Sequence, residues 1–545
     1  MTSRVMSCAT LGVDAYIVTI ETDIDRQLPA FFVVGLPDNA VRESRDRVTA
    51  AIKNAGRFFP NRHVTVNLAP ADVRKEGSAF DLPMAVGVLV ASSQVRTGLL
   101  DRHALVGELS LDGTLRPVRG VLSMAVAVRD AGLRGIIVPE ANAREAAMAE
   151  GLEVYPAADL THVIDFLEGL CRIAPFTTDV GELFRRGADH RVDFRDVKGQ
   201  EHVKRALEVA ASGGHNILLV GPPGSGKTML ARRLPTILPD LTLDEALAAT
   251  KIHSVAGLLP PDTSLITTRP FRSPHHTISD AGLIGGGAHP RPGEVSLAHH
   301  GVLFLDELPE FKKNVLEVLR QPIEDGRVTI SRAAMSLTYP AQFMLAAAMN
   351  PCPCGYYTDP HHECTCPPPL IQRYMTRLSG PLLDRIDLHV EVPAVKYKEL
   401  SGAPTGEPSC AIRERVNRAR RVQLGRLMGR QGVYCNAHMG AKEIREYGRI
   451  DGKGDELLRM AITRLGLSAR AYDRILKVSR TIADVEGEAD IQAQHVSEAI
   501  QYRSLDRNYG DVKMFSRDRA GRLFGLDISG TLCHEYGQPQ IRKDV

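Results

Sequence analysis

A glycine-rich segment between an apolar run and a helix-like run carries the residue types best suited to chemistry. It fits the pattern G-x-x-x-x-G-K-[ST], in which backbone N–H groups surround phosphate oxygens and a helix N-terminus adds positive partial charge. Lys227 would reach the β- and γ-phosphates, and Thr228 would hold Mg²⁺. A nucleoside triphosphate site explains this strand–loop–helix order better than a glycine- and proline-rich surface loop does. The predicted phosphate-binding residues are Gly221, Gly224, Ser225, Gly226, Lys227 and Thr228.

Two later strand-like runs end in polar side chains that suit hydrolysis of a nucleoside triphosphate bound at this loop. Residues 301–305 run into Asp306 and Glu307, and residues 343–349 run into Asn350. Asp306 would hold Mg²⁺ through its water shell, and Glu307 would polarise the attacking water as a general base. Asn350 would hydrogen-bond the γ-phosphate or that water. Because parallel strands end at one edge of a sheet, where α/β folds bind ligands, these residues predict ATP hydrolysis with Mg²⁺.

Composition narrows the class of protein. The 545 residues suffice for about three or four domains, each with its own core. Lysine plus arginine number 67 against 65 acidic residues, so the net charge of +2 neither favours nor excludes a nucleic-acid partner. No apolar run approaches the ~18 residues of a membrane span, so we expect a cytoplasmic protein without a membrane partner. Its nine cysteines then suggest thiols or metal ligands rather than disulfides.

The order of patterns along the chain predicts an α/β protein with several parts. Residues 1–165 alternate strand-like and helical runs and predict an α+β domain, and a polar, proline-containing linker follows at 166–191. Residues 192–395 predict an α/β core with a parallel sheet, and residues 396–506 predict a helical lid. Residues 507–545 form a tail without clear periodicity, and the sequence does not indicate its role.

Short runs in the first domain have clear patterns. Residues 15–20, 31–34 and 64–68 are expected to be strands. Residues 81–90 are apolar almost throughout and are expected to form a buried helix. These elements would supply the core of that domain.

Longer stretches carry a resemblance to a known family. They are Asp196–Gln200, Ala211–Asn216, Lys251–Gly257, Arg272–Thr277, Pro292–His299, Gly380–Asp387 and Gly466–Arg470. The region 193–507 that contains them resembles AAA+ ATPases, in the magnesium-chelatase-like branch that includes bacterial competence proteins. The resemblance implies a ring, expected to be a hexamer, with ATP bound between neighbouring subunits.

Two arginines acquire roles from this resemblance. Arg385 resembles the arginine finger that reaches the next subunit's site and stabilises charge on the transferring phosphoryl group. Arg470, at an expected helix start, resembles the second sensor, which contacts the γ-phosphate. Arg373 and Arg377 stay as alternative fingers, and ordinary ion pairs on helix surfaces are the plainer alternative for each.

A hairpin is predicted where related motors grip DNA. Val328, Ile330 and Leu337 alternate with polar residues and predict two strands with Arg332 near the tip. In related AAA+ motors this insertion projects into the central pore and contacts DNA, whereas a structural hairpin with a solvated arginine is the alternative. A second insertion, the flexible glycine run at 282–287, could also line the pore.

An arginine-rich stretch at the start of the lid offers a second DNA hypothesis. Such a density of positive charge can neutralise phosphates without reading base sequence, so binding would depend strongly on salt. Ion pairs between subunits of a ring are the alternative. The arginines are Arg413, Arg415, Arg418, Arg420, Arg421, Arg426 and Arg430.

Four cysteines form two C-x-C pairs after Asn350. Four thiolates brought together suit a tetrahedral structural Zn²⁺ site, although the spacing departs from the usual C-x₂₋₄-C. His361 or His362 could replace one ligand, and four reduced surface thiols are the alternative. The pairs are Cys352 with Cys354 and Cys364 with Cys366.

The N-terminal residues resemble the proteolytic domain of Lon. The matching segments are Arg74–Ala79, Gly107–Gly120 and Gly135–Glu140. The resemblance implies a serine activated by a lysine; Ser78 occupies the serine position, but Leu122 occupies the lysine position. Without its base the dyad should not hydrolyse peptides, so we expect a scaffold that helps ring assembly or contacts DNA or a partner.

Together these features predict a ring-forming ATPase that translocates on single-stranded or branched DNA. By resemblance it would be a branch-migration helicase in homologous recombination during natural transformation. The motor subunit of a magnesium-chelatase-type protein-remodelling complex is the alternative. An ATP-dependent protease is disfavoured by Leu122, and a nucleotide-binding scaffold without motor activity is disfavoured by Glu307 and Arg385.

Overall fold

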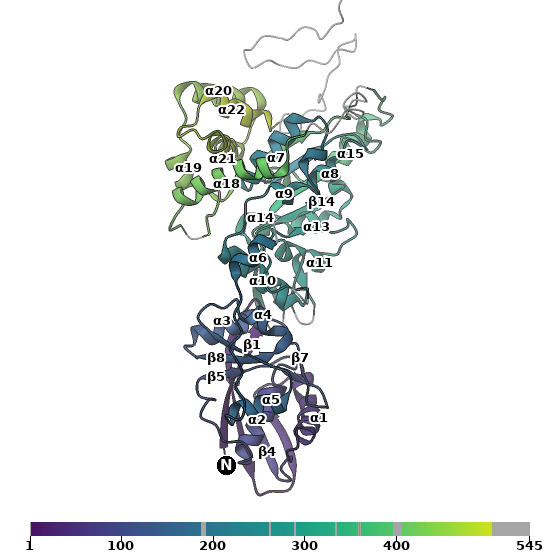
Figure 1. Cartoon of the computed structure of the whole chain (residues 1–545). Coiled ribbons are helices and arrows are strands. Elements are labelled where there is room, and N and C mark those ends of the chain that lie inside the picture. The colour runs from purple at the N-terminus through teal and green to yellow at the C-terminus, as the bar shows by residue number, and fades with distance from the viewer. Residues whose placement is uncertain are drawn as a thin grey trace, which may run out of the picture.

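The computed structural model shows an elongated molecule (Figure 1). The N-terminal domain lies at one end, the α/β core in the middle, and the helical lid at the other end beside the core. None of the helices among the described residues is long and apolar enough to cross a membrane. The structure describes residues 2–186, 192–260, 263–287, 290–332, 335–357, 359, 361–395, 406–430 and 432–503.

The N-terminal domain is built on a mixed seven-stranded sheet of order β3-β4-β2-β1-β5-β8-β9. β2 pairs antiparallel with β1 and β4, and the remaining neighbours are parallel. The three predicted strands are confirmed within β2, β3 and β4. The strands are β1 Thr2–Leu11, β2 Asp14–Asp25, β3 Ala30–Val34, β4 His63–Ala69, β5 His103–Leu105, β8 Gly135–Pro139 and β9 Glu153–Ala157, with the separate hairpin β6 Glu108–Leu109 and β7 Leu115–Arg116. The helices are α1 Asn39–Asn54, α2 Asp81–Ala91, α3 Val121–Asp130, α4 Glu140–Ala146 and α5 Leu160–Leu167.

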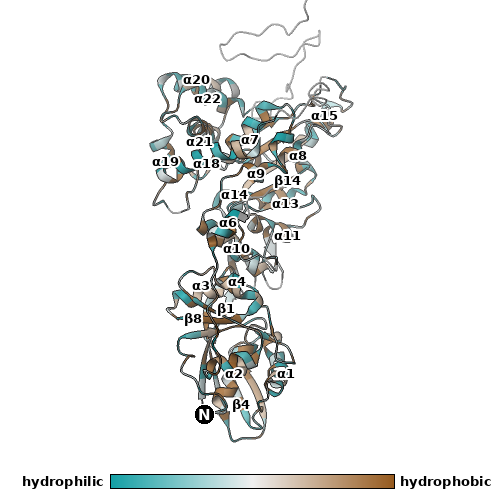
Figure 2. Ribbon diagram, viewed as in Figure 1, coloured by the Kyte–Doolittle hydropathy of each residue, from teal (hydrophilic) through white to brown (hydrophobic). Residues whose placement is uncertain are grey.

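The buried residues of this domain follow the sequence patterns expected for its strands and for its buried helix. Val64, Val66 and Leu68 alternate inward on β4, as the two-residue repeat of a strand requires. The buried helix predicted at 81–90 is confirmed as α2, which packs on β1 and β2. Figure 2 shows brown, apolar residues concentrated on α2 and the strands beside it.

The core contains a five-stranded parallel sheet of order β11-β14-β17-β10-β18. This confirms the predicted α/β core with a parallel sheet. Strands β10, β14 and β17 are buried along their whole length, which explains their continuous apolar sequences. The strands are β10 Ile217–Val220, β11 Phe271–Arg272, β14 Val302–Leu305, β17 Met344–Met349 and β18 Leu388–Glu391. The helices are α7 Glu201–Gly213, α8 Lys227–Ala231, α9 Leu234–Ile237, α10 Leu243–Ala256, α11 Asp280–Ile284, α12 Glu294–Leu297, α13 Lys313–Val318, α14 Arg320–Asp325, α15 Pro368–Met375 and α16 Gly380–Leu383, with short 3-10 turns at Phe194–Asp196 and Leu308–Glu310.

The predicted hairpin is confirmed, and most of the glycine run lies in regular secondary structure, while its place at a pore stays a prediction. β15 Arg327–Arg332 pairs with β16 Met335–Pro340, and Arg332 opposite Met335 is the last pair of this ladder. Residues 282–286 of this run lie in α11 and in β12 Gly285–Gly286, which pairs with β13 Arg291–Pro292. An added Cβ at Gly285 would lie 2.4 Å from the Arg291 carbonyl oxygen, so this glycine serves close packing rather than flexibility.

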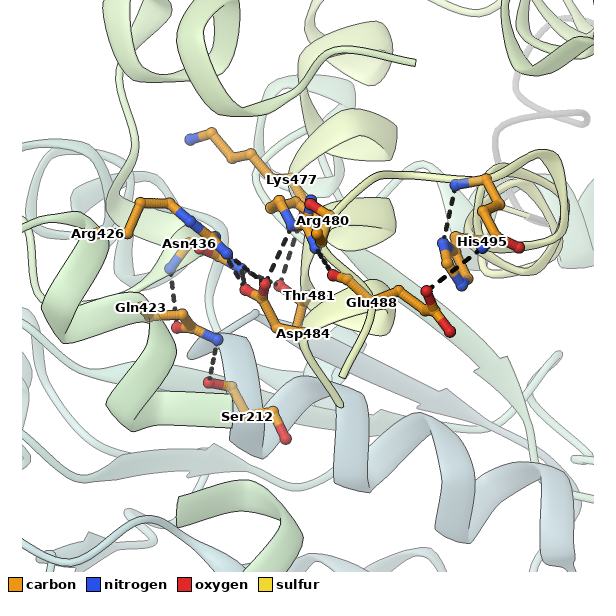
Figure 3. Close-up of polar contacts among 12 residues, drawn as sticks. Ser212, Gln423, Arg426, Asn436, Lys477, Arg480, Thr481, Asp484, Glu488 and His495 are labelled. Atoms are coloured by element: carbon orange, nitrogen blue, oxygen red, sulfur yellow. Dashed lines mark hydrogen bonds and ion pairs between the residues drawn. The ribbon is translucent and has the colours of Figure 1, made fainter. Parts of the chain in front are cut away.

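The lid is helical, as predicted, and it is held by buried charge. The Asp484 carboxylate accepts hydrogen bonds from Arg426 at 3.0 Å, Arg480 at 3.1 Å and Asn436 at 2.8 Å (Figure 3). Gln423 donates to the Ser212 carbonyl oxygen at 3.2 Å and so ties the lid to α7 of the core. The lid helices are α18 Ser409–Arg426, α19 Ala441–Tyr447, α20 Gly452–Leu465, α21 Ala469–Glu486 and α22 Ala493–Gln501, with a short 3-10 turn at Asn436–His438.

An apolar cluster joins the N-terminal domain to the core. Leu122 and Met148 of the domain pack with Leu241, Ala246 and Leu265 of the core, and we call these five residues the interdomain cluster. Figure 1 shows α3 and α4 directly beside α10 at this junction.

The stretch expected as a linker takes part in this junction. It contains α6 Val180–Arg186, and Val180, Leu183 and Phe184 pack on the interdomain cluster. The polar and proline-containing sequence concealed these three apolar residues at helical spacing. Nearby, buried Glu145 accepts hydrogen bonds from the Leu122 backbone N–H at 2.9 Å and from the Ser254 hydroxyl.

Leu122→Ala should loosen this junction. Removing a buried leucine side chain costs about 2–4 kcal/mol, because a cavity remains, so the thermal midpoint should fall by roughly 5 °C or more. Thermal unfolding monitored by circular dichroism measures the shift. Leu111→Ala is the matched control, because Leu111 is 59% exposed. Equal midpoints for both variants would contradict a structural role for the interdomain cluster.

Candidate nucleotide site

The glycine-rich loop leaves the sheet at the point where strand order reverses. β10 lies between β17 and β18, with Val220 level with Met349 on one side and Glu391 on the other. The Gly221 N–H donates to the Met349 carbonyl oxygen at 3.2 Å, which places the loop beside Asn350. Such a reversal point, at the carboxyl ends of parallel strands, is where open α/β sheets bind ligands.

Local backbone geometry explains the glycines. Gly226 immediately precedes α8. Its φ of 91° lies in the left-handed region, which glycine adopts without strain. A Cβ at Gly221 would lie 2.1 Å from the Val392 carbonyl oxygen, which no side chain could tolerate. Gln200 donates to the Ser225 carbonyl oxygen at 2.9 Å and supports the loop from the core. The loop therefore holds its backbone N–H groups in a fixed arrangement.

Lys227 is held inside the loop. Its Nζ donates to the carbonyl oxygens of Gly221 and Pro222 at 2.8 Å each and to Asn350 Oδ1 at 3.2 Å. Burial lowers the pKa of Lys227, and the negative charge of Asp306 opposes that shift. A bound phosphate would offer this ammonium a full negative charge in place of carbonyl dipoles.

Thr228 and Asp306 meet as the sequence predicts. The Thr228 hydroxyl donates to Asp306 Oδ2 at 2.7 Å, and the Glu307 N–H donates to Asp306 Oδ1 at 3.0 Å. Hydroxyl and carboxylate oxygens are the ligands that Mg²⁺ prefers, together with water and substrate phosphates. The residues present therefore fit a Mg²⁺-nucleotide at this edge of the sheet.

Glu307 projects from the same strand end with a partner that the sequence did not reveal. Its backbone has φ 53°, and its side chain is 59% exposed. His276 Nδ1 lies 3.5 Å from Glu307 Oε2, and the His276 ring also contacts Phe311. The segment Arg272–Thr277 carries the resemblance to AAA+ proteins, but its sequence alone assigns it no role. Its second histidine is placed to orient the predicted general base.

Arg385 is engaged within its own chain. The residue is 4% exposed, forms an ion pair with Glu324 of α14, and donates from Nη1 to the Pro381 carbonyl oxygen at 2.5 Å. The hydrogen bond from Arg385 lowers the pKa of Glu324, and Arg470 and Arg474 add to this effect. The finger and sensor candidates thus share one acidic neighbour, which sequence spacing did not indicate.

The alternative fingers are placed differently. Arg377 Nη1 pairs with Glu310 at 3.0 Å on the surface, close to the end of β14. Arg373 is exposed on α15. Both side chains are therefore more accessible to a neighbouring subunit than Arg385 is in this conformation.

The four cysteines converge in the loop that follows Asn350. Cys352 Sγ lies 3.3 Å from Cys354 Sγ and 3.7 Å from Cys364 Sγ, and all four sulfurs lie within 4.8 Å of one another. These separations suit the corners of a tetrahedron around one Zn²⁺ ion with Zn–S bonds of about 2.3 Å. His362 instead pairs with Asp359, at 3.2 Å, and is not needed as a ligand.

The arginines proposed to contact DNA differ in how much of their surroundings the structure describes and in their ion pairs. Arg332 lies at the end of β15, and its side chain is outside the described residues. In the lid, three of these arginines form ion pairs within the chain, which reduces the positive charge that they offer to phosphates. The pairs are Arg415 with Glu208 and Glu407, Arg426 with Asp484, and Arg430 with Glu443 and Glu446.

The serine of the Lon-like segment has an acidic partner. Ser78 donates a hydrogen bond to Glu108 in a cavity of about 580 Å³ between the N-terminal domain and the core. Leu122 lies in the interdomain cluster, where an apolar side chain rather than a lysine is required for packing. The described geometry does not provide Ser78 with the amine base of a Ser–Lys dyad.

Three family models match successive parts of the chain. A family model described as magnesium chelatase, subunit ChlI, matches residues 193–400. Models described as subunit ChlI of Mg-chelatase and as the ChlI C-terminal region match residues 20–142 and 406–503. The matches follow the N-terminal domain, the core and the lid in order.

Two relatives match over nearly their whole length. Competence protein ComM of Haemophilus influenzae is 45% identical over 507 residues, covering 92% of this chain and 97% of ComM. The uncharacterized protein YifB of Escherichia coli is 46% identical over 507 residues, covering 93% and 97%. Lon protease 2 of Bacillus subtilis is 32% identical over 157 residues, 26% of this chain and 27% of Lon protease 2. The chain belongs to the ComM and YifB family of magnesium-chelatase-related AAA+ proteins.

Glu307→Gln should separate nucleotide binding from turnover. The amide keeps the size of the side chain but cannot accept a proton, so ATP should still bind while hydrolysis falls roughly 100-fold or more. Phosphate release and equilibrium binding of a fluorescent ATP analogue measure the two quantities. Glu150→Gln is the control, since Glu150 is exposed and belongs to the N-terminal domain, outside the nucleotide site. Hydrolysis by Glu307→Gln near the unmodified rate would refute the general-base assignment.

Proposed function

We propose that this protein is an ATP-driven motor that assembles into a ring and translocates on DNA. The observation that carries the proposal is the pair of hydrogen bonds that brings four side chains together across three strand ends. Lys227 bonds to Asn350, and Thr228 bonds to Asp306. This arrangement supports binding of Mg²⁺-ATP with its γ-phosphate beside Glu307.

The hydrolytic step follows from these positions. Glu307 would accept a proton as water attacks the γ-phosphorus, and the bond to the bridging oxygen of ADP would break. Lys227 would stabilise negative charge on the β- and γ-phosphates, and Asn350 would orient the attacking water or the γ-phosphate. A Mg²⁺ ion held near Thr228 and Asp306 would neutralise the charge on the phosphates.

A neighbouring subunit would complete the site. We infer that Arg385 leaves Glu324 when subunits assemble around ATP and stabilises the transferring phosphoryl group from the next subunit, with Arg377 and Arg373 as the alternatives. Its buried Nε has no hydrogen-bond partner among the described residues, so its present position leaves one donor unsatisfied. Arg470 would contact the γ-phosphate as the second sensor. A hexamer is the proposed assembly.

DNA is the proposed track. The ComM relative is named for competence, and the confirmed hairpin at 327–340 would carry Arg332 into the central pore to contact the phosphate backbone. Single-stranded or branched DNA would then be moved as ATP hydrolysis shifts the hairpins. By extension, the reaction served would be branch migration in homologous recombination during natural transformation, in the cytoplasm.

A second candidate is the motor subunit of a magnesium-chelatase-type remodelling complex. The matching family models favour it, because they describe ChlI subunits over all three parts of the chain. In that case a partner protein would take the place of DNA. The same nucleotide site serves both candidates, so the substrate of the motor distinguishes them.

The four cysteines are proposed to hold a structural Zn²⁺ ion. Four sulfurs within 4.8 Å of one another can close a tetrahedral site without leaving a position for substrate. The ion would order the loop after Asn350 and would take no part in hydrolysis. The N-terminal domain is proposed to act as an inactive, Lon-like scaffold for the ring.

DNA should stimulate ATP hydrolysis in a manner that depends on salt. Contacts to the phosphate backbone release counterions, so the DNA concentration for half-maximal stimulation should rise about tenfold or more between 50 and 200 mM salt. Single-stranded, duplex and four-way-junction DNA are compared. Arg332→Ala should weaken stimulation, whereas Arg327→Ala, at the far end of the same strand, is the matched control. A rate indifferent to every DNA would favour the remodelling motor.

A further inference from the structure

The four-cysteine loop lies directly on the phosphate loop. Gly355 donates its N–H to Cys352 Sγ at 3.2 Å, in the turn between the two cysteine pairs. A Cβ built on Gly355 would lie 2.5 Å from Pro223 Cδ and 3.2 Å from Pro223 Cγ. The cysteine loop therefore touches the middle of the phosphate loop with no side chain between them.

A second connection runs through the backbone of β17. The residue after Asn350 and Pro351 is Cys352, which is fully buried. The Gly221 N–H bonds to the last carbonyl of β17, and Asn350 accepts from Lys227 at 3.2 Å. The end of the strand that positions the phosphate loop is thus also the start of the cysteine loop.

Metal binding changes how firmly these contacts can be held. Cys352–Cys366 contains no helix or strand among its described residues, so the loop relies on side-chain contacts for order. A Zn²⁺ ion bound by four thiolates would supply binding free energy that the metal-free loop lacks. Loss of the ion would remove the support at Gly355 from Pro223, and small displacements of a phosphate loop weaken its contacts with the ligand.

We propose that metal occupancy of the four-cysteine site controls the ATP affinity of the phosphate loop. With Zn²⁺ bound, the loop around Gly355 holds Pro223 in the geometry that binds phosphate. Without it, nucleotide binding weakens although every residue of the nucleotide site is present. The inference rests on the proposed Zn²⁺ and ATP sites and adds a coupling between them.

The first test removes the metal from the full-length protein. Zn²⁺ is measured by mass spectrometry, and the dissociation constant of a fluorescent ATP analogue is measured with Mg²⁺ present. A zinc-selective chelator should weaken binding by about tenfold or more, and added Zn²⁺ should restore it. Cys410→Ser is the thiol control, because Cys410 is exposed on α18 and outside the cluster. An unchanged dissociation constant after metal loss would overturn the coupling.

The second test breaks the contact and leaves the ligands in place. Gly355→Ala should retain Zn²⁺ and weaken nucleotide binding by about tenfold, because its Cβ forces Pro223 to move. Gly151→Ala is the matched control: its φ of 86° is close to the 89° of Gly355, but no atom lies within 4 Å of an added Cβ. Equal nucleotide affinities for the two variants would overturn the inference.

These measurements separate failure of the coupling from failure of the proposed sites. If the protein holds Zn²⁺ and binds ATP, and neither metal removal nor Gly355→Ala changes the ATP affinity, both proposed sites are supported and the coupling between them is refuted. Protein isolated without any metal refutes the Zn²⁺ site and the coupling together. Zinc-loaded protein that does not bind nucleotide refutes the proposed function itself.

Discussion

The pairing of β10 with β17 is the constraint on which the nucleotide site depends. Because Val220 and Met349 are in register, the two strands end at the same level and Gly221 meets the end of β17. That contact places Lys227 beside Asn350. The neighbouring register of β17 with β14 then brings Asp306 to Thr228. A slip of either register would separate side chains that lie far apart in sequence.

How much the sequence could predict depended on the range of each interaction. The phosphate loop, the strand ends at Asp306 and Asn350, and the hairpin at 327–340 have local patterns, and the expected parallel sheet brings the strand ends together. The roles of these residues remain predictions. The pairing of Arg385 with Glu324 had no local signal, because it depends on how α14 packs near the start of β18. The contact of His276 with Glu307 was missed for the same reason.

Several arginine side chains form ion pairs within this chain, and these pairs bear on the roles proposed for the arginines. Burial opposes the charge of Asp387, but Arg474 and His215 outweigh burial and hold the pKa of that carboxyl well below its ordinary value. Asp387 follows Arg385 by two residues and connects the core to α21 of the lid. Movement of the lid would therefore displace the segment beside Arg385, the candidate arginine finger. On the arginine-rich α18, Arg415 and Arg426 form ion pairs within the chain, whereas Arg418 and Arg421 are exposed.

Mixing two variants tests directly whether one subunit completes the ATP site of the next. Glu307→Gln lacks the proposed general base, and Arg385→Ala lacks the proposed finger, so each variant alone is expected to be nearly inactive. In a mixed ring, an Arg385→Ala subunit keeps Glu307 and can receive Arg385 from a Glu307→Gln neighbour. With subunit exchange verified by fluorescence energy transfer, ATP hydrolysis is expected to recover in the mixture. Hydrolysis that stays absent at every mixing ratio would contradict it.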